Sequence, residues 1–257
     1  MKVSANLGFL YTDRSLPTAV RAAEMAGFNA VECHFPYDVP TDELSAALHD
    51  ADLEMLGLNT VRGNVEKGEF GLSALPDRMP EARVAIDQAV AYADAVGAKN
   101  VHVMAGITEG SVRTEDVFRK NLAYACEVAT AHGIGILIEP INQRSVPGYY
   151  LSKLEHAADI IRDVGAVNLR LMFDCFHVQI TEGDLIHRLE KHLPIIGHVQ
   201  IAAVPDRGEP NAGEICYGEV LRALSGMGYR SPVGAEYVPR DGGAAGNLDW
   251  LDAFQDI

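Results

Sequence analysis

The sequence lacks several patterns that would tie it to a particular class of protein. It has no run of about 18 apolar residues and no signal-peptide pattern, so we expect a soluble, cytoplasmic protein that does not enter a membrane. Its four cysteines are scattered without a C-x-x-C pair, which argues against a disulfide framework or a zinc cluster. No G-x-G-x-x-G or G-x-x-x-x-G-K-[ST] motif follows an expected strand, which excludes the usual nucleotide-binding loops.

Basic residues are also scarce relative to acidic ones. The chain has 36 Asp and Glu against 21 Lys and Arg, a formal net charge of −15 at pH 7. Such an excess of negative charge repels polyanions, so we expect no nucleic-acid partner and favour small molecules as ligands. An anionic substrate is still compatible with this charge, because a bound cation and one arginine can reverse the field inside a cleft.

What the sequence does contain is a regular alternation of strand-like and helix-like segments. Its 257 residues fit one (β/α)8 TIM barrel, which typically has about 250 residues. Strict alternation predicts a parallel sheet with right-handed crossovers, and eight units favour closure into a barrel. The expected strands lie at 3–10, 30–33, 53–58, 100–104, 136–139, 169–174, 195–200 and 232–236, with helices between them and at the end. We therefore predict an α/β fold, a single-domain TIM barrel over residues 1–257.

Local signals mark several helix starts and one unusual loop. Thr41 and Thr114 are expected to cap the helices that follow them, and Ser152 with Glu155 forms the S-x-x-E pattern of a capping box. The segment 59–80 contains three glycines and is too long for an ordinary turn between a strand and a helix. We interpret this segment as a candidate lid.

Four oxygen-bearing side chains stand at the ends of successive expected strands. Glu139, Asp174, Gln200 and Glu236 are separated by 35, 26 and 36 residues, close to the roughly 32 residues of one barrel unit. Oxygen donors alone suit a hard divalent cation such as Mg²⁺ or Mn²⁺ rather than zinc. A cation would also relieve the repulsion among three converging carboxylates. Each residue taken alone could instead be a helix cap, an ion-pair partner or a polar strand end.

Two glutamates on one cation suit a particular reaction. A bound metal polarises a carbonyl and stabilises an enediolate, while one carboxylate removes a proton from the hydroxyl-bearing neighbour carbon and the other can return it on the adjacent carbon. Glu139 and Glu236 are therefore the predicted acid/base pair of an isomerase.

Five short motifs surround these positions: EPIN at 139–142, FDCFH at 173–177, GHVQIA at 197–202, PDRGEP at 205–210 and GAEY at 234–237. Together they resemble the hydroxypyruvate isomerase family, which lies within the xylose isomerase-like barrels that also contain ketose 3-epimerases. The resemblance runs along nearly the whole chain. It implies a cation held by Glu139, Asp174, Gln200 and Glu236, with Glu139 and Glu236 also as the acid/base pair. Wider relatives among the epimerases carry histidine where this chain has Gln200, which weakens the transfer of epimerase activity.

Three further residues are candidates for substrate binding. His177 and Arg207 match positions that bind substrate in the family that the chain resembles. A guanidinium fork fits a carboxylate bidentately, so Arg207 is the expected partner of a substrate carboxylate. His102 is the third candidate, for which a packed core histidine is the alternative. His34, Asn59 and His198 also lie near expected strand ends, with site and packing roles both open.

We predict an aldose–ketose type isomerase that interconverts hydroxypyruvate and 2-hydroxy-3-oxopropanoate (tartronate semialdehyde) by proton transfer between two glutamates. A 2-oxo-tetronate isomerase, a ketose 3-epimerase and a polyol dehydratase of the same superfamily are the alternatives. An endonuclease IV-like barrel is disfavoured by the net charge of −15, and a noncatalytic metal-dependent binding protein is a third class. The sequence leaves open the exact small hydroxy-oxo acid, the metal, the glutamate that acts first, and whether the chain forms a homo-oligomer.

Overall fold

Nine parallel strand segments lie side by side in one sheet of the computed structural model, which describes residues 1–257. Their order in the sheet is β3-β2-β1-β9-β8-β7-β6-β5-β4. Their bounds are β1 Val3–Asn6, β2 Ala30–Glu32, β3 Glu54–Met55, β4 Leu58–Asn59, β5 Asn100–His102, β6 Gly135–Ile138, β7 Leu169–Asp174, β8 Ile196–Ile201 and β9 Val233–Ala235.

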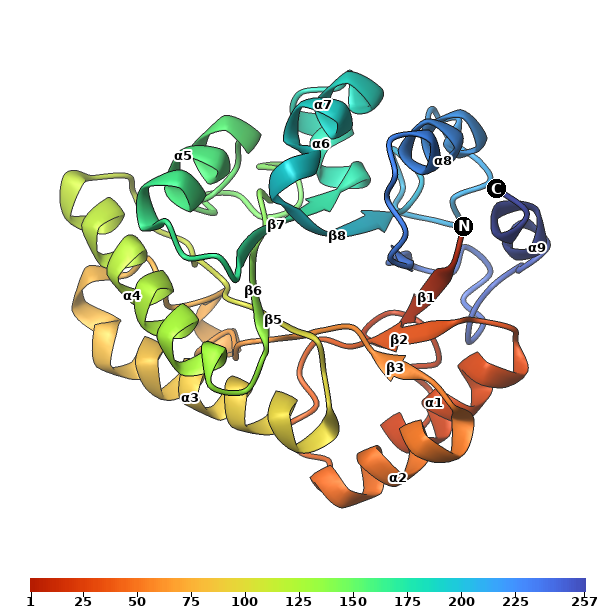
Figure 1. The fold of residues 1–257 in the computed structure, drawn as a ribbon, viewed down its shortest axis with the longest axis horizontal. Coiled ribbons are helices and arrows are strands. Elements are labelled where there is room, and N and C mark those ends of the chain that lie inside the picture. Colours follow the sequence, from red (N-terminus) through yellow and green to blue (C-terminus); the bar gives the residue numbers. More distant parts are fainter.

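The segments β3 and β4 are two halves of the third expected strand. β3 pairs with β2 and β4 pairs with β5. Between the halves, Leu56 N donates to Val31 O at 2.7 Å and Cys33 N donates to Gly57 O at 3.1 Å. Because one continuous piece of chain bonds to both edges of the sheet, the strands form a closed ring (Figure 1). The prediction of a TIM barrel is confirmed.

Helices cover the outside of this ring (Figure 1). The longer ones present buried alanine, valine, leucine and isoleucine side chains to the strands, and these join the strand residues in one apolar cluster. None of the helices combines the length and the apolar character needed to cross a bilayer. The bounds are α1 Leu16–Met25, α2 Thr41–Ala51, α3 Met79–Val96, α4 Val112–Thr130, α5 Leu154–Val164, α6 Cys175–Thr181, α7 Leu185–His192, α8 Tyr217–Gly226 and α9 Trp250–Gln255, with short 3₁₀ helices η1 Val65–Lys67, η2 Pro76–Arg78 and η3 Leu193–Ile195.

Two expected helix caps are wrong in position. Ser111, rather than Thr114, caps α4: its Oγ accepts a hydrogen bond from Thr114 N at 3.0 Å. α2 begins at Thr41 after Pro40, and no side chain caps it. Thr41 is thus the first residue of the helix and not its cap.

The expected capping box at the start of α5 is also wrong. The helix begins at Leu154, and Leu154 N donates to Glu182 Oε1 at 2.9 Å, with no capping bond from Ser152. Glu182 follows α6 and is far away in the sequence, so a tertiary contact supplies the acceptor that the local pattern assigned to Ser152. α6 itself was not expected, although Asp174 starts it by accepting from Phe176 N at 2.8 Å.

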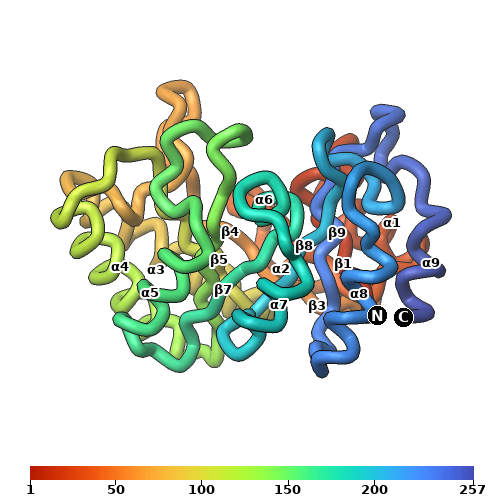
Figure 2. The backbone as a smooth tube through the Cα atoms, turned by 90° about the horizontal axis from the view of Figure 1, so that it is seen from above, coloured from red at the N-terminus to blue at the C-terminus, as the bar shows by residue number.

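Two loops project beyond the barrel at the carboxyl ends of the strands. In Figure 2 the orange segment after β4 and the green segment after β6 extend on the same side of the molecule. The first is the expected lid segment, and an antiparallel bridge between Gly71 and Ala105 ties it to the loop after β5. Gly71 has φ +114°, and a Cβ there would lie 2.7 Å from Met104 O, so only glycine fits this close approach.

Candidate active site

A cavity of about 630 Å³ opens between these loops at the carboxyl ends of the strands. Five of the seven residues that the sequence proposes for the site line it: His102, Glu139, His177, Arg207 and Glu236. A more open groove of about 890 Å³ lies beside α4. Its charged residues include Glu115, which pairs with Arg119 and His156, and none of the seven proposed site residues lines it.

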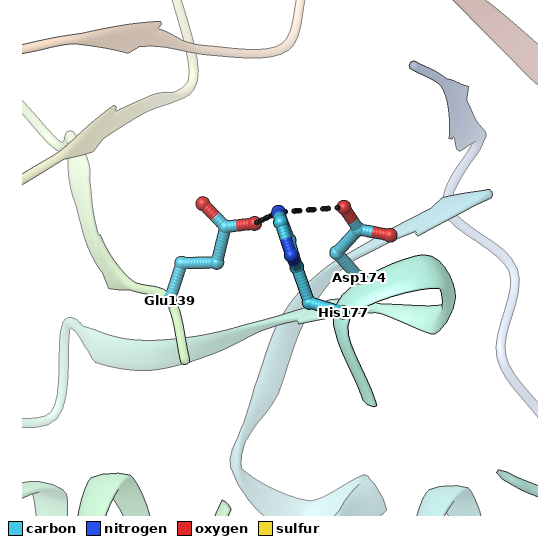
Figure 3. A group of neighbouring side chains, drawn as sticks. All are labelled: Glu139, Asp174 and His177. Atoms are coloured by element: carbon cyan, nitrogen blue, oxygen red, sulfur yellow. Dashed lines mark ion pairs between the residues drawn. The ribbon is translucent and has the colours of Figure 1, made fainter. Parts of the chain in front are cut away.

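Glu139, Asp174 and His177 come together in one cluster (Figure 3), and Glu139 and His177 of this cluster line the cavity. Glu139 directly follows β6, Asp174 ends β7, and His177 lies on α6. His177 Nε2 is 3.6 Å from Glu139 Oε1 and 3.5 Å from Asp174 Oδ2. One ligand atom from each residue lies within 4.8 Å of the others, and all three side chains are buried.

The orientation of His177 is fixed from behind by Asn142. The backbone N–H of Asn142 donates to His177 Nδ1 at 3.3 Å, and its Nδ2 lies 2.6 Å from the same atom. A backbone N–H can only donate, so Nδ1 is the acceptor and the neutral ring carries its proton on Nε2. Burial, with the nearby Arg207 charge, lowers the pKa of His177 well below its usual value and keeps the ring neutral. The Nε2–H of His177 is therefore a donor available to a ligand in the cavity.

Glu236 reaches the cavity from the end of β9 and has three partners. His34 Nε2 donates to its Oε1 at 2.8 Å, and Asn6 Nδ2 donates to the same oxygen at 3.1 Å. Arg207 Nη2 donates to Glu236 Oε2 at 2.6 Å and to Asp174 Oδ2 at 3.3 Å. One guanidinium thus joins two of the four expected cation ligands.

The loop after β8 holds Arg207 in this position. Arg207 has φ +56°, an unusual backbone conformation for a residue other than glycine, and its N donates to Ala203 O at 2.9 Å while its O accepts from Val238 N at 2.8 Å. The guanidinium carbon lies 5.0 Å from the ring centre of Phe9 and 4.9 Å from that of Phe176. Two aromatic faces and two carboxylates therefore fix the guanidinium.

Gln200, the partner of Asp174 on the neighbouring strand, does not line the main cavity, and neither does Asp174. Gln200 is buried in β8, and its Nε2 donates to Glu32 Oε1 at 2.9 Å. Glu32 also accepts from Asn6 Nδ2 at 2.9 Å and binds His198 Nε2 at 2.5 Å through its other oxygen. Sequence reasoning missed Glu32, although a single acid within the apolar run Ala30–Cys33 was a visible signal.

Comparison with known proteins places this arrangement in a family. The family model described as xylose isomerase-like TIM barrel matches residues 20–254. The chain belongs to this xylose isomerase-like TIM barrel family. A 2-oxo-tetronate isomerase from Cupriavidus necator is 40% identical over 256 residues, 98% of each chain. A putative hydroxypyruvate isomerase from Homo sapiens is 41% identical over all of this chain and 96% of its own.

The solved structures agree with this assignment. A crystal structure from Brucella melitensis, named an AP endonuclease of family 2, is 37% identical over 98% of this chain and 99% of its own, with a TM-score of 0.94. The resemblance to the hydroxypyruvate isomerase family is therefore confirmed, and with it the prediction of an enzyme of this isomerase type, because full-length relatives carry that name.

The xylose isomerase-like site concentrates negative charge unevenly. Burial, together with the Glu236 and Asp174 carboxylates, raises the pKa of Glu139 well above its usual value. Burial also raises the pKa of Asp174 to about 7, although Arg207 opposes the shift. For Glu236 burial acts in the same direction, but Arg207 and His34 outweigh it and lower the pKa to about 2. The side of the cavity that carries Glu139 is thus short of positive charge.

Several buried polar atoms of this site have no partner within the chain. They include Glu139 Oε1, Gln200 Oε1 and both ring nitrogens of His102. Buried polar atoms are nearly always satisfied in folded proteins, so these atoms are suited to a ligand. His102 Nδ1 lies 3.8 Å from Glu139 Oε2, and burial lowers the pKa of His102 to about 3. The free oxygens of Glu139 and Gln200 fit a hard divalent cation, and Glu139 has no arginine or lysine partner to compete with it.

Proposed function

We propose that this protein isomerises a small hydroxy-oxo acid, either hydroxypyruvate or 2-oxo-tetronate, by moving a proton between two neighbouring carbon atoms. The observation that carries this proposal is the convergence of Glu139 and Glu236 in one buried cavity at the carboxyl ends of the strands. The names of the relatives from Cupriavidus necator and Homo sapiens support the same substrate class. The proposal makes Glu139 and Glu236 the catalytic pair.

We infer that a divalent cation, Mg²⁺ or Mn²⁺, completes the site. Glu139, Asp174, Gln200 and Glu236 are the proposed ligands, because they offer oxygen atoms only. The unpartnered Glu139 Oε1 and Gln200 Oε1 support this set. His177 lies close to two of the ligands, but the proton on its Nε2 makes it a donor to substrate instead. When bound, such a cation supplies positive charge opposite the oxygen atoms of an enediolate.

The residues of the cavity have separate proposed roles in the reaction. One glutamate takes the proton from the hydroxyl-bearing carbon, and the other returns it on the adjacent carbon; the two exchange these roles when the reaction runs backwards. His177 Nε2–H donates to a substrate oxygen and so positions the substrate between the glutamates. Arg207 keeps Glu236 ionised, since it lowers the pKa of that carboxyl group, so Glu236 starts without a proton.

The other activities that the sequence left open have less support. An epimerase or dehydratase would use the same cavity, but its known structural counterparts share only the fold with this chain: a 3-keto-D-glucoside 4-epimerase from E. coli is 19% identical, with a TM-score of 0.80. A nuclease of the kind named for the Brucella melitensis structure would need a positively charged surface for DNA. The net charge of −15 offers none overall.

The test is an isomerase assay in deuterated water. Protein dialysed against a chelator is offered hydroxypyruvate or 2-oxo-tetronate with and without Mg²⁺ or Mn²⁺, and deuterium at the carbon next to the carbonyl is measured. We expect isomerisation with exchange only when a cation is added. Glu139→Gln and Glu236→Gln should each lower kcat about 10²–10⁴-fold, whereas Glu190→Gln, an exposed glutamate on α7, should not change it.

Each part of the proposal can fail separately. Full activity of chelated protein without detectable bound metal would refute the cation. Unchanged kcat in both glutamine variants would refute the acid/base pair. Turnover of neutral ketoses but of neither acid would point to an epimerase.

A further inference from the structure

A second guanidinium faces the cavity, and no acid neutralises it. Arg62 lies in the loop after β4, within the expected lid segment, and it lines the cavity together with Arg207. These two arginines are the only lysine or arginine residues of the cavity wall. Arg207 is already bound to Glu236 and Asp174, at 2.6 and 3.3 Å. The positive charge that is free for a ligand therefore belongs to Arg62.

Aromatic rings rather than carboxylates hold the Arg62 side chain. Its guanidinium carbon lies 4.6 Å from the ring centre of Phe35 and 5.7 Å from that of Phe70. Stacking of this kind positions a guanidinium while leaving its N–H groups free to donate. Its backbone is fixed as well, because Gly71 N donates to Arg62 O at 2.9 Å. The charge is thus held in place with its hydrogen-bonding capacity unused.

Glu69, an acid of the same loop that also approaches Gly63, is bound by other groups. Glu69 accepts from Arg78 Nη1 at 2.7 Å and from the backbone N–H of Asn64 at 2.6 Å. Arg78 is in turn shared with Glu81. The Glu69 carboxylate is thus paired with Arg78, and Arg62 forms no ion pair with it.

The same wall of the cavity connects Arg62 to the catalytic pair. Phe35, which stacks on Arg62, directly follows His34, and His34 Nε2 donates to Glu236 Oε1 at 2.8 Å. Arg62 and Glu236 line the same cavity, so a substrate whose reacting carbons lie against Glu236 has Arg62 as the free cation of the wall for its acid group. A planar fork of N–H donors matches a carboxylate in shape as well as in charge.

We propose that Arg62 is the carboxylate-binding residue of this cavity and selects acids over neutral sugars. This inference rests on the proposed function for the identity of the acid, and it replaces the expectation that Arg207 binds the substrate carboxylate. Arg207 then serves mainly to position Glu236 and Asp174. Selectivity resides in the loop after β4, and the barrel wall supplies the chemistry.

The first experiment measures binding without turnover. D-glycerate has the carboxylate and hydroxyl groups of the proposed substrate but no carbonyl, so its dissociation constant can be measured by calorimetry in the presence of excess Mg²⁺ or Mn²⁺. Arg62→Gln should weaken glycerate binding about 10- to 100-fold. Arg62→Lys should restore part of the loss, because it returns the charge without the fork. Arg144→Gln, an exposed arginine of the loop after β6 outside the cavity wall, is the control and should bind as the unaltered protein does.

The second experiment compares two substrates. Dihydroxyacetone carries a hydroxymethyl group where hydroxypyruvate has its carboxylate. Arg62→Gln should raise KM for hydroxypyruvate by a similar 10- to 100-fold, about as much as the loss of glycerate binding, and leave kcat/KM for dihydroxyacetone within about 3-fold. If Arg62 has a purely structural role, Arg62→Gln should lower kcat/KM for both substrates together and should also lower the melting temperature.

The outcomes separate this inference from the proposed function. Unchanged glycerate binding in Arg62→Gln, or no glycerate binding by the unaltered protein, would overturn the assignment. A selective loss of acid binding in Arg207→Gln alone would return the role to Arg207. Glycerate binding that depends on Arg62 in a protein that isomerises neither acid would keep the carboxylate site and refute the proposed reaction.

Discussion

Removing the buried carboxylate of Glu32 should destabilise the barrel more than any surface change. Glu32 is only 4% exposed and accepts three hydrogen bonds from side chains, those of Asn6, Gln200 and His198. The Glu32 charge also outweighs burial at His198 and raises the pKa of that ring. Glu32→Ala leaves these donors without an acceptor in the barrel interior.

The size of the effect follows from this geometry. Removing one partner of a buried ion pair costs about 3–5 kcal/mol, because the other charged group stays buried without compensation. The free energy of unfolding of a natural domain is about 5–15 kcal/mol in total. For chains of about this length each kcal/mol lowers the melting temperature by about 2–4 °C. We therefore expect Glu32→Ala to melt about 6–20 °C below the unaltered protein.

The assay is thermal and denaturant unfolding of four proteins: unaltered, Glu32→Ala, His198→Ala and the double variant. Since the two side chains share one contact, the double variant should lose about 0.5–3 kcal/mol less than the sum of the single losses. Glu219→Ala is a matched control, because it breaks an exposed pair with Arg222 and should cost at most about 1 kcal/mol. A loss below about 1 kcal/mol for Glu32→Ala, or strict additivity with His198→Ala, would refute the reasoning.

Two further predictions follow from the loops and the charges of the site. Gly71→Ala should lower the unfolding free energy by about 1–3 kcal/mol and speed hydrogen exchange in the segment 59–80, because the added Cβ would lie 2.7 Å from Met104 O. Gly68→Ala is the control and should cost less, because nothing lies within 4 Å of a Cβ there. Equal costs of the two substitutions would contradict this account. In chelated protein the melting temperature should fall as pH rises from about 4 to 7, since the pKa of Asp174 is raised from 3.8 to about 7 and that of Glu139 is raised as well. In this pH window the folded state binds more protons than the unfolded chain, so stability is lost as these carboxyl groups deprotonate. Excess Mg²⁺ should reverse the trend. A melting temperature that rises with pH in chelated protein would contradict this prediction.

Much of the fold could be predicted from the sequence because its signals are local. Apolar runs of strand length alternate with helical periodicity along the whole chain. This order predicts a parallel sheet covered by helices, and the count of eight units favours a barrel. The departures lie where a contact from outside the segment decides the outcome. Glu182 bonds to the first turn of α5 in place of Ser152, and the third strand divides into β3 and β4 because its two halves bond to different neighbours.

The candidate site, too, could be predicted only in part from local patterns. The sequence identifies three acids as candidates, Glu139, Asp174 and Glu236, because each follows or ends an apolar run of strand length. The carboxyl ends of parallel strands meet at one face of a barrel, so these acids were expected to lie together. What no local pattern could show is which side chain binds which. His34 meets Glu236 across 202 residues and Glu32 meets His198 across 166.

The sequence by itself therefore determined the fold class, the places where strands end and the acids that stand at those ends, since each depends on the period and polarity of a short segment. Only the tertiary structure decided how charge is shared among them. It ties Arg207 to Glu236 and Asp174 and leaves Arg62 free between two phenylalanine rings. Pairing energies depend on distances of a few ångströms between atoms that are remote along the chain, and those distances exist only once the barrel has closed.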